Sequence, residues 1–169
     1  MAARERRRLI TLDPNVRLNV EPDLEVWRAR VQAMATHADL VKVSGEDLAA
    51  MYPGRSVDAT VGRWLANGVR LVVVTRGADG ATAFTERHRV VAAGERIRVV
   101  DTVGAGDSFR AALLCAIDEL GLASRAGLEG LDEAAFPGLR HPPRGDHLRA
   151  PRRRSAAPPR AAGAGVAAR

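Results

Sequence analysis

Asp101-Thr102-Val103-Gly104-Ala105-Gly106-Asp107-Ser108-Phe109 joins an apolar run at 97–100 to an amphipathic one. The apolar residues that follow recur at steps of three and four: Phe109, Ala112, Leu113, Ala116, Ile117 and Leu120. This pattern predicts a strand, a tight glycine loop and a helix that starts at the loop. The first N–H groups of a helix have no intrahelical acceptor, and the helix dipole adds partial positive charge. We therefore expect an anion to bind there.

Asp107 has two interpretations. Asp is a preferred N-cap residue, so this carboxylate could simply cap the helix. It could also act as a general base beside an anion that Gly104, Ala105 and Gly106 cradle. The spacing alone leaves both interpretations open.

The rest of the chain predicts an α/β fold with a largely parallel sheet, because strands alternate with helices. The expected strands cover 9–13, 39–43, 71–75 and 97–100, with a hairpin over 81–85 and 90–92. Helices are expected over 24–34, 46–51, 57–65 and 109–120. Ligands of such sheets bind beyond the carboxyl ends of the strands. Polar residues gather at those ends: Asp13, Asn15 and Arg17; Lys42, Ser44 and Asp47; Thr75, Arg76 and Gly77; and 101–107.

The charge of the chain is unevenly distributed. The net charge of the 169 residues is +6, yet residues 137–169 hold eight Arg and one Asp, which is +7. The other 136 residues therefore sum to −1. Segment 136–169 is rich in Pro, Arg and Ala, has no apolar periodicity, and is predicted to be a disordered tail. Residues 137–169 contain no aromatic residue for base stacking, so nucleic-acid binding is not favoured.

The predicted organisation is a charged segment at 1–8, one domain at 9–135 and the tail. No segment approaches the ~20 apolar residues of a membrane span, so we expect a cytoplasmic protein that does not bind membranes. A single cysteine, Cys115, excludes an internal disulfide.

The glycine motifs exclude two common nucleotide sites. The chain has no Gly-x-x-x-x-Gly-Lys-Ser/Thr and no Gly-x-Gly-x-x-Gly. Phosphoryl transfer suits the remaining features, since it needs an anion cradle, a neutralising cation and a base.

The motif at 101–109 resembles the second signature of the PfkB, or ribokinase-like, carbohydrate kinases. The segments at 13–17, 41–47 and 75–80 resemble further motifs of that family, in the family's order, and the 13–17 segment resembles fructokinase-like members. The resemblance covers about residues 9–135. It implies a three-layer, Rossmann-like α/β fold, here incomplete.

The resemblance also implies ATP-dependent phosphorylation of a sugar hydroxyl, with Mg²⁺. Asp107 would be the base, with the anion hole at Gly104, Ala105 and Gly106. The nucleotide would be bound by Lys42, near the phosphates, and by Thr75, Gly77 and Gly80. A rim for substrate and phosphate would include Asn15, Arg17, Asp101 and Thr102. Asp47 would hold Mg²⁺ through water.

The sequence departs from the family pattern in three ways. Ser44 and Asp47 stand where the family has the longer Asn and Glu. The family's amino-terminal half, with most sugar contacts, has no counterpart, and the segment after Asp132 suggests a frameshifted end. We therefore expect a truncated kinase with weak or no activity alone, as a homodimer or paired with a separately encoded amino-terminal half. The alternative is a non-catalytic α/β module that binds a nucleotide or a partner.

Overall fold

The computed structural model describes residues 9–94 and 104–131. Segments 1–8 and 136–169, the expected strand at 97–100, and both Asp101 and Thr102 lie outside the described residues. The described elements are, in order, β1 (Thr11–Leu12), α2 (Leu24–Ala35), β2 (Leu40–Ser44), α3 (Gly45–Met51), α4 (Val57–Ala66), β3 (Leu71–Thr75), η1 (Gly77–Asp79), β4 (Ala81–Phe84), β5 (Arg89–Ala92), α5 (Ala105–Glu119) and α6 (Arg125–Glu129).

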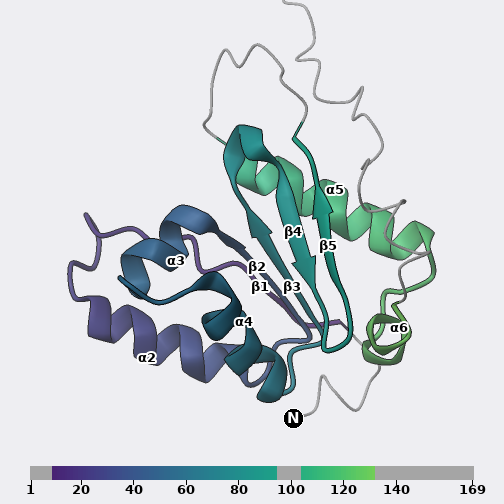
Figure 1. The fold of residues 1–169 in the computed structure, drawn as a ribbon, viewed down its shortest axis with the longest axis horizontal. Coiled ribbons are helices and arrows are strands. Elements are labelled where there is room, and N and C mark those ends of the chain that lie inside the picture. The colour runs from purple at the N-terminus through teal and green to yellow at the C-terminus, as the bar shows by residue number, and fades with distance from the viewer. Residues whose placement is uncertain (1–8, 95–103, 132–169) are drawn as a thin grey trace, which may run out of the picture.

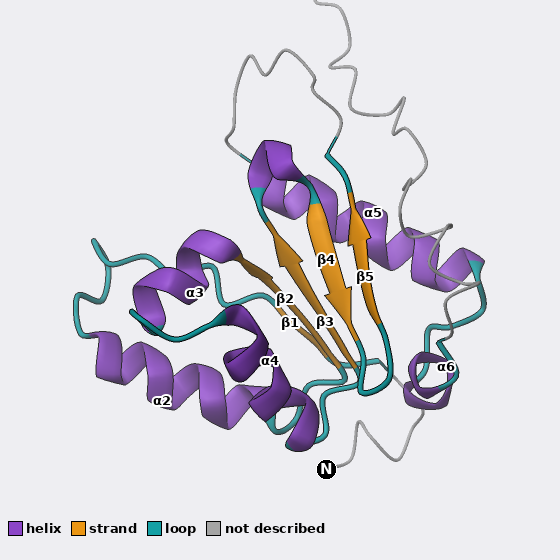
Figure 2. Cartoon of the chain, in the orientation of Figure 1, coloured by secondary structure: helices purple, strands orange, loops and turns teal. Residues whose placement is uncertain are grey.

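These strands form one sheet in the order β1-β2-β3-β4-β5 (Figure 2). The pairs β1–β2 and β2–β3 are parallel, whereas β3–β4 and β4–β5 are antiparallel. The α/β class is confirmed. The described sheet is mixed rather than largely parallel, because the predicted hairpin supplies two of its four strand pairings.

Helices cover both faces of the sheet, as Figure 1 shows. Successive side chains of a strand point to opposite faces, so the residues of β2 divide between two cores. Val41 and Val43 join a core with α2, α3 and α4, while Leu40 joins one with α5 and α6. The predicted three layers are therefore present. By the same alternation, Lys42 points to the α5 side.

Four helices begin with a side-chain cap. Asp23, Ser44, Ser56 and Ser124 each accept a backbone N–H of the first turn of α2, α3, α4 and α6. The helix α5 differs, because its N-cap is Gly104, with φ +79° and no side-chain cap. Among the described α-helices, the one without a side-chain cap is thus the one that the glycine motif opens.

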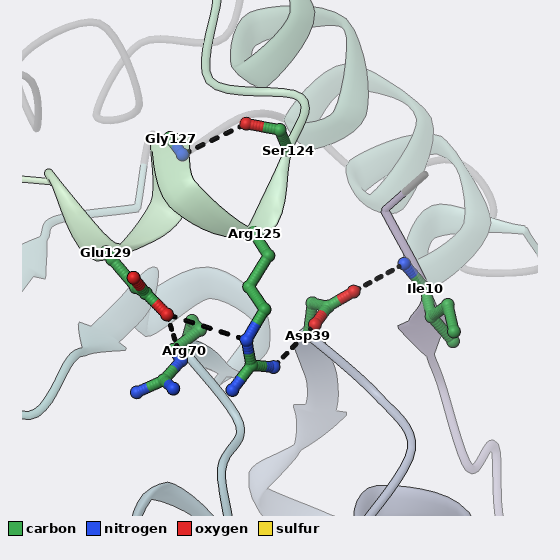
Figure 3. A network of polar contacts seen from close by, with 7 residues as sticks. All are labelled: Ile10, Asp39, Arg70, Ser124, Arg125, Gly127 and Glu129. Atoms are coloured by element: carbon green, nitrogen blue, oxygen red, sulfur yellow. Dashed lines mark hydrogen bonds and ion pairs between the residues drawn. The ribbon is translucent and has the colours of Figure 1, made fainter. Parts of the chain in front are cut away.

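A polar network around the buried Asp39 ties α6 to the amino-terminal ends of the strands (Figure 3). The carboxylate of Asp39, 1% exposed, accepts the Ile10 N–H at 3.0 Å and pairs with Arg125 at 2.8 Å. Glu129 of the same helix lies 2.9 Å from Arg70 Nε and 3.5 Å from Arg125 Nε. This end of the sheet is closed by ion pairs, and the opposite end carries the predicted site. Within the described part of the chain, no helix is long and apolar enough to span a membrane.

Candidate active site

Lys42 forms a buried ion pair at the carboxyl edge of the sheet. Its Nζ lies 3.1 Å from Oδ2 of Asp13, and each side chain is only 6% exposed. Asp13 directly follows β1, whose Leu12 pairs with Val41 of the parallel strand β2. One step further along this register places Asp13 beside Lys42, the only lysine of the chain. Burial at this level makes the interaction between the two charges much stronger than that of an exposed pair.

The same ammonium reaches the glycine motif. A Cβ built on Gly106 would lie 3.2 Å from Lys42 Nζ, closer than most real Cβ contacts. Gly106 therefore leaves room for the ammonium against the first turn of α5. This placement brings together Lys42 and the motif, which are more than 60 residues apart in sequence.

The start of α5 offers hydrogen-bond donors. The Ser108 N–H bonds to the Gly104 carbonyl at 2.9 Å, so the three preceding N–H groups of the helix are those without an intrahelical acceptor. Gly104 supplies no capping oxygen. This geometry suits an anion, as the sequence predicts.

Asp107 is the third residue of α5 and is exposed. The N-cap interpretation of this residue is wrong, because Gly104 occupies the N-cap position. A carboxylate in the first turn of a helix still interacts favourably with the helix dipole. Its role as a base stays a prediction.

Asp47 lies half-buried in the first turn of α3, facing the loop that follows β1. Its N–H donates to Ser44 Oγ at 3.0 Å. Burial raises the pKa of the Asp47 carboxyl, against the lowering effect of hydrogen bonds from Ser44 and the Val16 N–H and of the Arg17 charge; the negative charge of Asp13 adds to the rise. Asp47 thus lies close enough to Asp13 and Arg17 to sense both charges.

That loop also carries Asn15, which is exposed and has φ +46°, in the left-handed region. Arg17 is exposed and donates to the Val16 carbonyl. Asn15 and Arg17 therefore lie exposed in the loop that follows β1, and their contacts with substrate stay a prediction.

The turn after β3 is shaped by two glycines with positive φ. Gly77 has φ +55° and open space around it. Gly80 has φ +89°, and a Cβ there would overlap the carbonyl oxygen of Ala92. Thr75 ends β3 opposite Ser44 of β2, and so lies on the same edge as Lys42. Gly80 thus has a packing reason to be glycine, and the predicted nucleotide contact of this turn stays a prediction.

The sequence places Asp13 on this edge but assigns it no role, and the structure makes it the partner of Lys42. The alternation of side chains along the strands puts both residues on the α5 face, but the register that sets them side by side comes from the structure. Neither of two described cavities reaches this edge. One of about 710 Å³ lies between α2, α3 and α4, and one of about 220 Å³ lies near α6.

Among the described residues, no group of three or more His, Cys, Asp or Glu side chains is placed to hold a metal ion. Mg²⁺ does not need such a cage, since one or two carboxylates, phosphate oxygens and waters complete its shell. The half-buried Asp47 carboxylate therefore fits Mg²⁺ that arrives with phosphate oxygens.

Comparisons with known proteins agree on the kind of fold. Residues 1–135 match the family model described as pfkB family carbohydrate kinase. The chain is 41% identical over 150 residues to a fructokinase of Rhizobium leguminosarum bv. trifolii, covering 87% of this chain and 46% of that protein. It superposes on the fructose-, ADP- and calcium-bound fructokinase of Vibrio cholerae O395 with a TM-score of 0.61 and 28% identity, covering 77% of this chain and 41% of that one.

A third comparison shows the fold alone. An E. coli protein described as ribokinase II, in complex with ATP and Mg²⁺, has a TM-score of 0.57 and 24% identity, and covers 71% of this chain and 38% of that one. The chain thus spans less than half the length of each of these three proteins.

Proposed function

We propose, because this chain belongs to the pfkB family of carbohydrate kinases, that its carboxyl edge carries the phosphoryl-transfer part of an ATP-dependent sugar kinase. One observation supports this most: the Lys42 ammonium lies against Gly106, in the uncapped first turn of α5. A buried cation and free N–H groups at one point form a cradle for phosphate.

In the proposed reaction, Asp107 accepts the proton of a sugar hydroxyl. The hydroxyl oxygen then bonds to the γ-phosphorus of ATP while the bond from that phosphorus to the ADP oxygen breaks. The backbone of Gly104, Ala105 and Gly106 stabilises the charge on the transferring group, and Lys42 neutralises the phosphates. Positioning in line supplies most of the acceleration in such transfers.

We also propose sites for the nucleotide and the metal on this edge. Thr75, Gly77 and Gly80 would line the nucleotide. Mg²⁺ would be held by Asp47 through water and would neutralise phosphate charge when bound. The rim for substrate and phosphate would be completed by Asn15, Arg17, Asp101 and Thr102. The Vibrio structure, which holds ADP and calcium, supports a nucleotide and a divalent cation as ligands.

The sugar that we propose is fructose. Both the Rhizobium relative and the Vibrio structure are fructokinases, and the latter holds fructose and ADP. The identity of 41% to the first supports a shared substrate class.

These residues alone would turn over sugar weakly or not at all. They match under half of each relative, and catalysis requires both substrates to be held in line. We propose that the rest of the sugar site comes from further polypeptide, such as a separate amino-terminal half or a second copy. Because the chain matches less than half of each relative, a second candidate function is also favoured: a module that binds a nucleotide without catalysis.

A coupled assay of ADP release over a panel of sugars, with fructose included, separates the two candidates. Fructose-dependent ADP release, weak in this chain and raised by adding the amino-terminal half of the Rhizobium relative, is expected for the kinase. Binding of Mg·ATP without sugar-dependent release under either condition would favour the non-catalytic module.

A further inference from the structure

Asp13 has no part in the proposed reaction, yet it is the partner of the residue that meets the phosphates. The two charged groups are 3.1 Å apart, and both side chains are buried. Among the described residues, Asp13 is the only acidic side chain within ion-pair distance of Lys42.

The position of Lys42 is unfavourable without such a partner. Its ammonium lies at the amino-terminal turn of α5, where the helix carries partial positive charge and repels a cation. A lysine side chain has a flexible four-carbon stem, so it can swing its charge toward solvent at little cost. An anchor is therefore needed to keep the ammonium where a phosphate would meet both the cation and the helix.

We propose that Asp13 is a positioning residue that holds Lys42 Nζ against the first turn of α5 before ATP binds. The inference rests on the proposed function, since it assigns Asp13 the task of preparing that phosphate cradle. Asp13 itself touches no reacting atom, and it acts only through Lys42.

Positioning and simple electrostatics predict opposite results. Replacing Asp13 with Asn removes a negative charge beside the phosphate site, so electrostatics alone would tighten the binding of ATP. If Asp13 instead anchors Lys42, the same change frees the ammonium and weakens the binding of ATP.

Calorimetric titration of Mg·ATP into the full chain tests whether Asp13→Asn weakens or tightens the binding of ATP. We expect Asp13→Asn to weaken binding by about tenfold or more, as displaced binding groups do. In a Lys42→Met background, Asp13→Asn should change affinity by less than about twofold, because the effect acts through Lys42. The control is Asp58→Asn, which breaks an exposed ion pair to Arg89 and should leave affinity within about twofold.

A second readout does not depend on ATP. Lys42 is the only lysine of the chain, so acylation by an amine-reactive ester can be followed at this one side chain by peptide mass spectrometry. The amino-terminal amine serves as an internal reference. Lys42 should be labelled several-fold faster in Asp13→Asn than in the wild type, while the reference rate stays unchanged.

The outcomes separate the two proposals. If the wild-type chain does not bind Mg·ATP, the proposed function fails, and the labelling rates still decide the role of Asp13. If Asp13→Asn binds Mg·ATP as tightly as the wild type or tighter, or if Lys42 labelling is unchanged, the positioning role is wrong.

Should Asp13→Asn not fold, Asp13→Glu replaces it, since this variant keeps the charge and moves the carboxylate by one methylene. It should bind Mg·ATP more weakly than the wild type, and wild-type affinity would equally overturn the proposal.

Discussion

Asp107 lies where a carboxylate stabilises the helix and where the proposed reaction needs a base. Its carboxylate lies in the first turn of α5, where it interacts favourably with the helix dipole, and the residue is exposed. Sequence reasoning could name the residue but could not choose between cap and base. The structure excludes Asp107 as the N-cap, because Gly104, three residues before it, is the N-cap and the helix begins at Ala105.

Asp107→Asn should lower fructose-dependent ADP release, measured with the amino-terminal half of the Rhizobium relative added, by about 10²–10⁴-fold, the usual contribution of a general base. The affinity for Mg·ATP should stay within about twofold, because this carboxylate is not proposed to bind the nucleotide. Asp118→Asn, an exposed residue later in the same helix, is the matched control and should keep full activity. Equal loss in both variants would contradict the assignment of Asp107 as base.

Asp47 predicts a pH dependence of stability. Burial raises the pKa of this carboxyl above its ordinary value of 3.8, so the folded state holds the proton more tightly than the unfolded state does. Between the two pKa values the folded state binds more protons, and the free energy of unfolding therefore falls as the pH rises. The contribution is fully present below about pH 3.8 and is lost as the pH passes the raised pKa.

Asp47→Asn lacks this titration. The difference in melting temperature, wild type minus Asp47→Asn, should therefore decrease from pH 3.5 to pH 7 in scanning calorimetry. A difference that stays constant or increases with pH would show that burial does not control this carboxyl.

At the scale of elements, continuous apolar runs were the most predictable feature. The strand expected at 71–75 matches β3 (Leu71–Thr75), and the strand expected at 39–43 matches β2 (Leu40–Ser44) within one residue. Both are buried on two faces, so nearly every position had to be apolar. The strand expected at 9–13 is shorter in the structure, where β1 (Thr11–Leu12) lies at the edge of the described sheet and only these two residues pair with β2.

The helix α6 (Arg125–Glu129) was not predicted from the sequence. Its five residues are too short to show a helical period, and its place depends on the contact between Arg125 and Asp39, 86 residues apart in sequence. Likewise, the pairing of Lys42 with Asp13 depends on strand register, which composition and spacing do not give.

The turn after β3 gives a prediction at this scale. Gly80→Ala should destabilise the protein by about 3 kcal/mol or more, because the backbone conformation there is nearly restricted to glycine and the new methyl group meets the backbone of β5. Gly62, in the interior of α4, has nothing near its Cβ position. Gly62→Ala should therefore stabilise by about 0.5–1 kcal/mol. Urea denaturation of both variants measures the contrast, and similar changes in the two would refute the close approach at Gly80.

At the scale of the whole molecule, the two ends of the sheet differ in the kind of polar residue that they carry. The amino-terminal end is closed by the Asp39–Arg125 pair and Glu129 (Figure 3), and the carboxyl end presents the proposed site. The charged residues at the amino-terminal end are therefore structural, whereas those at the carboxyl end are the ones that we propose to bind ligands. This difference predicts that substitutions at the first end change stability without changing ligand contacts.

Arg125→Met should destabilise the fold by about 2–4 kcal/mol, because it leaves the fully buried Asp39 carboxylate without its cation. Arg89→Met, which breaks an exposed pair with Asp58, should cost less than about 1 kcal/mol. Chemical denaturation checks both values. A loss in Arg89→Met as large as that in Arg125→Met would contradict the view that burial sets the difference.

The central claim is that phosphate of ATP binds at the carboxyl edge, against the start of α5. Titration of Mg·ATP into the ¹⁵N-labelled chain, followed by amide chemical shifts, tests it most directly. The account predicts the largest shifts at residues 104–108, around Lys42 and over residues 75–80, with amides of α6 unchanged. Shifts concentrated at the α6 end, or no saturable shifts at the start of α5, would contradict it.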